Sequence, residues 1–152
     1  MSRLILLDAG PVGLLSKALG RPDAARCRGW LDSPLRGEDE VAVPEIARHE
    51  VRRELFRLGM SGGLARLDQL HPKLIRLPIA GDVMDVASEL WAGLRRAGRP
   101  TAGDKALDGD AILAAQAFVA ARDGQIVIVA TGNVQHLDRF TGLDARQWDL
   151  IR

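Results

Sequence analysis

The sequence has 152 residues, which corresponds to one domain and is long enough to bury a core without disulfide staples. Its hydrophobic fraction of 47% and charged fraction of 27% exclude a mainly disordered chain. A net charge of +1 argues against a protein that coats nucleic acid, and no apolar run is long enough for a membrane span. The one cysteine, Cys27, agrees with a reducing compartment, so we expect a cytoplasmic protein.

Strand and helix signals alternate along the chain. Short apolar runs predict strands, and amphipathic stretches bounded by proline, glycine or aspartate predict helices. In chain order, the expected elements are a strand at 3–7, helices at 11–19 and 22–31, a strand at 41–43, helices at 44–58, 64–70 and 82–97, a long helix from 108 to about 122, a strand at 125–130, a short helix at 133–140 and a final strand at 146–151. Residues 74–77 fit either a strand or a loop. This order predicts an α/β sandwich with a parallel sheet.

Polar residues gather where the predicted strands end. Asp8 directly follows the first strand, and Thr131 and Asn133 follow the strong apolar strand near the C-terminus. Ligands of parallel sheets bind at the carboxyl ends of the strands, so these residues are candidates for a site. From the sequence alone, Asp8 is either a helix cap or a metal ligand, and the other two residues also suit a turn.

Two further acidic residues lie on predicted helices. Glu50 borders the apolar face of helix 44–58, where, taken alone, an ion pair with Arg53 or another arginine is the better explanation. Glu45 in the first turn suits the helix dipole, so a structural role is the simpler interpretation. Asp108 is the expected cap of the long helix, which leaves Asp110 as the functional candidate.

Asp8, Glu50, Asp110 and Asn133 therefore form an oxygen-rich set from four segments. Converging carboxylates repel one another unless a cation neutralises them, and hard oxygen ligands suit Mg²⁺ or Mn²⁺. The chemistry that fits is metal-assisted hydrolysis of a phosphodiester. Motifs for a phosphate-binding loop, a serine nucleophile elbow and a zinc site are missing from the sequence.

Four segments together resemble a PIN domain, and specifically a VapC-type ribonuclease toxin of type II toxin–antitoxin systems. They are LLDAGPVGLL (6–15), VPEIARHEVRREL (43–55), LDGDAILAAQA (107–117) and IVATGNVQHLDRFTGL (128–143). The resemblance covers essentially the whole chain. It implies one PIN-like domain over residues 1–152, folded as a three-layer α/β/α sandwich with a central, mainly parallel sheet.

The resemblance also implies the roles of individual residues. Asp8, Asp110 and Glu50 would hold Mg²⁺ or Mn²⁺, with Glu45 as a second possibility for the acid of the helix after the second strand. The implied catalytic set adds Thr131 and Asn133 to these three acids. Asparagine departs from the fully acidic pattern of the family, which puts tight binding of a second metal in doubt.

Other implied contacts lie around this set. His136 stands where many relatives have an aspartate or a histidine, at the rim of the pocket. Arg48, Arg52 and Arg99 would hold the RNA backbone. With no tyrosine and only 3 Phe and 3 Trp, base stacking is a poor expectation, so contacts to the backbone are favoured.

The implied partners are an RNA substrate, a cognate VapB-like antitoxin and a second copy of the chain in a homodimer, with no membrane. The antitoxin's C-terminal segment would lie in a groove, next to an exposed apolar strip near residues 44–70. Two alternatives stay open. One is a catalytically weak PIN-fold module that binds RNA or protein, which Asn133 favours. The other is an unrelated α/β enzyme with a deep apolar pocket for a small molecule.

Overall fold

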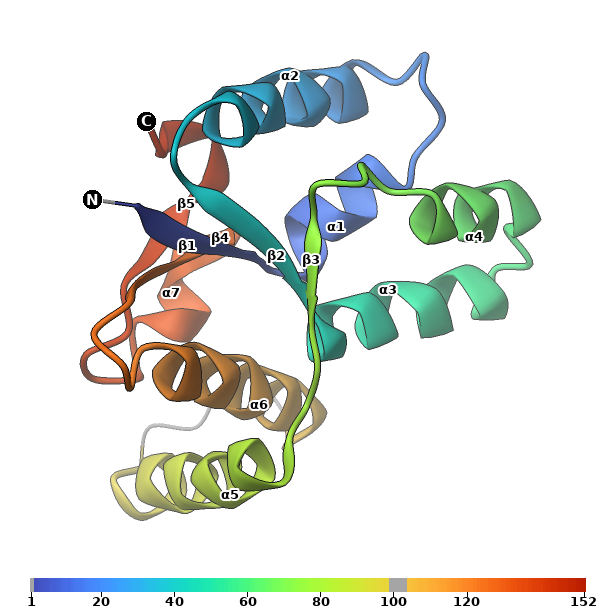
Figure 1. The fold of residues 1–152 in the computed structure, drawn as a ribbon. Helices are drawn as coiled ribbons and strands as arrows, with labels where there is room; N and C mark the ends of the chain where they lie inside the picture. The colour runs from blue at the N-terminus through green and yellow to red at the C-terminus, as the bar shows by residue number, and fades with distance from the viewer. Residues whose placement is uncertain (1, 99–103) are drawn as a thin grey trace.

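A computed structural model of the protein describes residues 2–98 and 104–152. Strands and helices follow one another nearly as the sequence predicts (Figure 1). In chain order the elements are β1 (Arg3–Leu7), α1 (Ala9–Leu15), α2 (Pro22–Arg36), β2 (Glu40–Pro44), α3 (Glu45–Arg57), α4 (Ser61–Asp68), β3 (Ile75–Leu77), α5 (Gly81–Arg96), α6 (Asp104–Ala120), β4 (Ile126–Thr131), α7 (Val134–Leu137), β5 (Ala145–Gln147) and the 3₁₀ turn η1 (Trp148–Leu150).

The five strands form one sheet in the order β3-β2-β1-β4-β5, and every pairing within it is parallel. β1 lies between β2 and β4, with Leu6 opposite Ala42 on one side and Leu7 opposite Ala130 on the other. The carboxyl ends of β1, β2 and β4 therefore meet at the same edge of the sheet, where the sequence placed its polar candidates.

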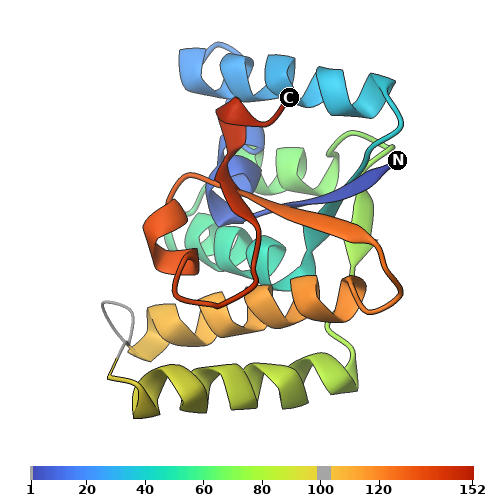
Figure 2. The same ribbon diagram turned by 90° about the vertical axis from the view of Figure 1, so that its left-hand side faces the viewer.

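Helices cover both faces of the sheet, so the predicted three-layer α/β/α class is confirmed. Ile5 and Leu7 pack into a core with residues of α1, α2 and α3, whereas Leu6 packs on the opposite face with residues of α6. In Figure 2, α2 (blue) lies on one side of the sheet and α6 and α5 (orange and yellow-green) lie on the other. Strand side chains alternate between the faces, which explains why both faces of these strands are apolar.

A buried amide fixes α6 to the sheet and to α3. The Gln116 side chain is almost fully buried, and its Nε2 donates to Leu77 O at 2.9 Å and to Pro78 O at 3.2 Å. Its Oε1 accepts from Ile46 N at 3.5 Å, in the first turn of α3. This contact sets the position of α6 relative to α3, and these two helices hold the acidic candidates Asp110 and Glu50.

Some predicted boundaries were wrong. α6 begins at Asp104, so Asp108 lies exposed inside the helix and does not cap it. The physical reason is Leu107, which is fully buried and draws the preceding turn onto the core. The final strand is only Ala145–Gln147, and Trp148 turns inward at the start of η1. Residues 74–77 prove to contain a strand, β3, which pairs with β2.

Among the described residues, no helix combines the length and apolar character that crossing a membrane requires.

Candidate active site

Asp8 is held by hydrogen bonds from two directions at the end of β1. Its Oδ1 accepts from Ala9 N at 2.7 Å, which caps α1, and its Oδ2 accepts from the Thr131 hydroxyl at 2.7 Å. Thr131 is itself buried at the end of β4, and its Oγ1 accepts from Asn133 N at 3.0 Å. Asp8 can therefore be both a helix cap and a metal ligand. Only Oδ1 accepts the capping hydrogen bond, and the carboxylate lies at the carboxyl edge of the sheet.

Glu50 and Asp110 approach Asp8 from the two helices that Gln116 links. α3 starts directly after β2, so Glu50 lies in its second turn, and α6 brings Asp110 from the opposite layer. Asp110 is largely buried, with 19% of its side chain exposed. Its Oδ2 has no hydrogen-bond partner among the described residues, and His136 Nδ1 lies 3.9 Å from that oxygen. An unpaired buried carboxylate oxygen is the kind of atom that a cation would satisfy.

The charges of these three side chains act on one another. Burial, followed by the charges of Asp8 and Glu50, raises the pKa of Asp110 to about 7, against a lowering by Arg139. Burial and then the charge of Asp8 raise the pKa of Glu50, while Arg53 lowers it. Burial also raises the pKa of Asp8, although the bonds from Thr131 and Ala9 and the charge of His136 oppose the rise. Clusters in which one carboxyl group disfavours ionisation of the next are typical of catalytic and metal sites.

The donor set fits a hard divalent cation. Its atoms are carboxylate oxygens, which suit Mg²⁺ or Mn²⁺. One of these oxygens, Asp110 Oδ2, has no hydrogen-bond partner in the described ranges. Within residues 2–98 and 104–152, however, no three His, Cys, Asp or Glu side chains are arranged to hold a metal ion jointly. Mg²⁺ usually binds through only one or two carboxylates and keeps several waters, so this spacing is compatible with a partly hydrated ion.

Asn133 is linked to Asp8 through its backbone and Thr131, whereas Glu45 has Arg76 beside it. The Asn133 side chain is exposed, and among the described residues it makes no capping hydrogen bond at the start of α7; only its backbone N–H joins the network. Glu45 lies near Arg76 at 3.7 Å, which supports the structural role expected for it. Cys27 is buried in the core, where burial raises the pKa of its thiol to about 11.

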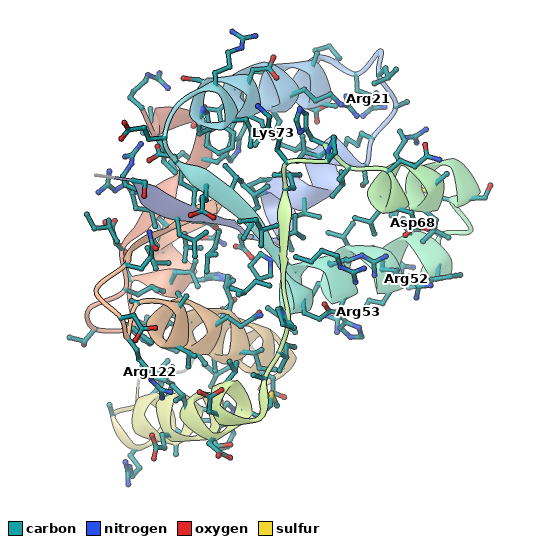
Figure 3. All side chains as sticks on the ribbon, viewed as in Figure 1. Arg21, Arg52, Arg53, Asp68, Lys73 and Arg122 are labelled. Atoms are coloured by element: carbon teal, nitrogen blue, oxygen red, sulfur yellow. The ribbon has the colours of Figure 1, made fainter. Side chains whose placement is uncertain are left out.

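The predicted RNA-binding arginines are not gathered at the carboxylates. Arg48 pairs with Asp68 of α4 at 2.7 Å, and the Arg52 guanidinium lies 4.7 Å from the centre of the Phe56 ring. Figure 3 shows Arg52 and Arg53 on α3 and Asp68 on the neighbouring helix α4. Arg99 lies outside the described residues.

Two arginines that the sequence analysis did not select as RNA contacts act on the site instead, although Arg53 was a possible ion-pair partner of Glu50 in the sequence analysis. Arg53 lowers the pKa of Glu50, and Arg139 lowers the pKa of Asp110. The signal for Arg53 was available, because residues three apart share a helix face. Arg48 and Arg52, each two positions from Glu50, point to the other side of α3. The sequence holds no comparable local signal for Arg139, because its distance from Asp110 depends on tertiary structure.

A groove of about 570 Å³ runs beside the carboxylates between α1 and α3. Its charged groups are Lys17, Glu50, Arg53 and Glu54, and Leu58 and Met60 also line it. The side chain of Phe56 is 56% exposed, that of Leu58 54% and that of Met60 45%. The apolar strip expected near residues 44–70 is thus present at the end of α3 and in the turn that follows it.

Comparisons with known proteins assign the fold. No protein-family model matches the sequence, and no curated protein matches it. Among solved structures, a chain of the Rickettsia felis VapBC2 complex bound to a promoter DNA fragment is similar with a TM-score of 0.73 at 15% identity, over 94% of this chain and 97% of that one. A chain of the DNA-bound VapBC complex of Salmonella typhimurium gives a TM-score of 0.73 at 18% identity, over 97% and 99%.

A third similar structure is VapC20 of Mycobacterium tuberculosis, described as a sarcin-ricin loop cleaving toxin. Its TM-score is 0.55 at 15% identity, over 85% of this chain and 91% of that one. The architecture is therefore a PIN-domain fold of the VapC type, as the sequence motifs predicted. Shared folds host different functions, so the function has to be argued from the site.

The raised pKa of Asp110 predicts a stability that depends on pH. An unfolded aspartate titrates near pH 3.9, so between about pH 4 and pH 7 the folded chain binds the extra proton and stability falls as pH rises. In EDTA, Asp110→Asn should match the wild type at pH 4 and exceed its unfolding free energy by about 1–4 kcal/mol at pH 8. Urea unfolding at both pH values measures this; an advantage of equal size at pH 4 and pH 8 would contradict it.

The Thr131 hydroxyl should be required to hold Asp8 ionised. Thr131→Val removes the donor to Asp8 Oδ2 and the acceptor of Asn133 N, and we expect a loss of about 1–3 kcal/mol at pH 8 together with a higher pKa of Asp8. Thr131→Ser keeps the hydroxyl and serves as the matched control. Urea unfolding and carboxyl ¹³C NMR titration read the two effects, and equal pKa values of Asp8 in both variants would show that the hydroxyl is unimportant.

Proposed function

We propose that this chain is a metal-dependent endoribonuclease toxin that hydrolyses RNA phosphodiester bonds and is neutralised by a cognate VapB-like antitoxin. The observation that carries the proposal is the cluster of Asp8, Glu50 and Asp110 at the carboxyl edge of a parallel sheet with a VapC-type fold. Capping of α1 accounts for Asp8 but not for Glu50 and Asp110 beside it, because burying like charges together costs stability.

Asp8, Asp110 and Glu50 would hold Mg²⁺ or Mn²⁺, partly through water. When bound, the ion supplies neutralisation of the three charges, polarisation of a phosphate and a water of lowered pKa. The hydrogen bond from Thr131 orients the Asp8 carboxylate for this purpose and opposes the rise in its pKa that burial causes. Oδ2 of Asp110 is the oxygen we assign first to the cation, because it has no hydrogen-bond partner among the described residues and His136 Nδ1 lies 3.9 Å away from it.

The RNA backbone would lie along the groove between α1 and α3. Arg53 is exposed there beside Glu50, where its guanidinium can contact a phosphate next to the scissile one. Arg52 points to the other side of α3, over the Phe56 ring, and Arg99 lies outside the described residues, so both stay predictions as RNA contacts. Arg48 is the weakest of the three candidates, because it is engaged with Asp68 on the side of α3 that faces α4.

The same groove suits the antitoxin. Its apolar end at Leu58 and Met60 would take apolar side chains of a bound segment, and its acidic end at Glu50 would take a cationic side chain. Several similar structures are VapBC complexes, which supports a VapB-like partner. A homodimer remains part of the proposal on the strength of the sequence resemblance.

A catalytically weak module that binds RNA or protein is the second candidate. Two observations favour it: the exposed neutral Asn133 and the lack, within the described residues, of three side chains arranged to share a metal. Such a module would bind RNA without cleaving it.

Cleavage of RNA decides between the two functions. We expect the purified chain to cleave a labelled RNA pool, or a hairpin with a sarcin-ricin loop, in Mg²⁺ or Mn²⁺ but not in EDTA. Asp110→Asn should lower the rate at least about a hundredfold, because it removes a metal ligand. Asp85→Asn, at an exposed position of α5, is the matched control and should cleave like the wild type.

Equal cleavage by wild type and Asp110→Asn would contradict the assignment of the site. RNA binding without cleavage of either substrate would favour the binding module.

Arg53 and Arg48 should differ in their effect on the substrate. Arg53→Gln should raise KM about three- to tenfold and change kcat less, because it removes a charged contact to the RNA backbone and leaves all three carboxylates in place, although it also removes the charge that lowers the pKa of Glu50. Arg48→Gln only breaks the ion pair with Asp68, so its KM should stay near that of the wild type. Steady-state kinetics on a short cleavable RNA measures both values, and a larger KM for Arg48→Gln would reverse the assignment.

A further inference from the structure

Gly109 occupies an unusual position in α6, directly before Asp110. Glycine in a helix interior is less stable than alanine, so its presence calls for a reason. At position 109, the Glu50 side chain already occupies the space that a side chain would need. A Cβ built on Gly109 would lie 2.8 Å from Glu50 Oε1, 3.3 Å from Glu50 Cδ and 3.6 Å from Glu50 Oε2.

Other helical glycines of the described chain show that this contact is specific. A Cβ on Gly29 of α2 or on Gly93 of α5 would meet nothing within 4 Å. At Gly63 of α4 the close neighbour is the apolar side chain of Leu55, at 2.8 Å. Among the helical glycines that the structure describes, only Gly109 has a carboxylate in the place of its side chain.

We propose that Gly109 is a positioning residue that lets the Glu50 carboxylate lie against α6 beside Asp110. This inference rests on the proposed function, in which these two acids share a cation. A methyl group at position 109 would force Glu50 to move, because carbon and oxygen atoms do not approach to 2.8 Å without a bond or a hydrogen bond. Glycine at this position lowers the stability of the helix, but it lets the carboxylates of Glu50 in α3 and Asp110 in α6 approach each other.

The effect on a metal follows from the geometry that Mg²⁺ and similar ions demand. Ligand oxygens must lie near 2.0–2.1 Å from Mg²⁺ in a nearly ideal octahedron, so a shift of several tenths of an ångström at one carboxylate removes it from the coordination shell. Gly109 contacts no substrate or metal in this scheme. It acts only through Glu50, which makes the inference testable by combining the two substitutions.

The experiment compares Gly109→Ala, Glu50→Ala, the double variant and Gly93→Ala with the wild type. Melting temperatures are measured in EDTA, and Mn²⁺ binding is measured by titration calorimetry. Gly93→Ala, the matched control, should raise Tm by about 2–4 °C without changing Mn²⁺ affinity. Gly109→Ala should weaken Mn²⁺ binding about tenfold or more and should not show this rise in Tm.

The double variant tests the route through Glu50. Without the Glu50 carboxylate, the added methyl meets no oxygen, so Gly109→Ala in the Glu50→Ala background should raise Tm by the amount seen for Gly93→Ala. Mn²⁺ affinity should not fall further than in Glu50→Ala alone.

Two results would overturn the inference. One is a Gly109→Ala protein with wild-type Mn²⁺ affinity and the same rise in Tm as Gly93→Ala. The other is a loss of folding in the double variant as well as in Gly109→Ala, because the glycine would then serve the backbone and not Glu50. If the wild type binds no Mn²⁺, the proposed metal site is contradicted. The Tm values of the four variants and the wild type still decide whether Gly109 makes room for Glu50.

Discussion

Repulsion among three carboxylates that cannot move apart is the constraint on which this site depends. Asp8 is held by hydrogen bonds to both of its oxygens, and α3 and α6 fix Glu50 and Asp110 on either side of it. Because the backbone prevents separation, the charges are accommodated by other means. One is protonation, since the pKa of Asp110 rises to about 7, and another is partial compensation by Arg53 and Arg139. A divalent cation would remove the same strain while leaving all three groups ionised.

Apolar packing elsewhere in the fold offsets the free-energy cost of burying these carboxylates together. The strands that end at the site are buried on both faces, so their positions are set by the two cores and do not respond to the carboxylates. Gln116 adds a directional link, because its hydrogen bonds to Leu77, Pro78 and Ile46 fix α6 against the sheet and α3 at once. A site built on rigid elements keeps its geometry even when its own charges oppose it.

Local patterns in the sequence were sufficient for β1, β2 and β4, but they left β3 undecided and made the final strand too long. An apolar run that ends in Asp8 identifies both a buried strand and its functional edge, and helical phase explains why Arg53 accompanies Glu50 while Arg48 does not. The start of α6 was mispredicted, because the burial of Leu107 outweighs the capping preference of Asp108. The role of Gly109 is invisible in the sequence, since it depends on where a side chain from another helix meets α6.

Asn133 is best understood through the same charge balance. A fourth carboxylate after β4 would add a negative charge to a cluster in which burial already raises the pKa of three acids. Asparagine keeps the backbone N–H that donates to Thr131, and so preserves the hydrogen-bond chain to Asp8 without the extra charge. Three carboxylates carry at most three negative charges, of which one divalent ion offsets two and the nearby arginines can offset the remainder. If the proposed metal site exists, a single divalent cation would suffice for this charge balance, and the neutral side chain after β4 adds no charge that would have to be offset.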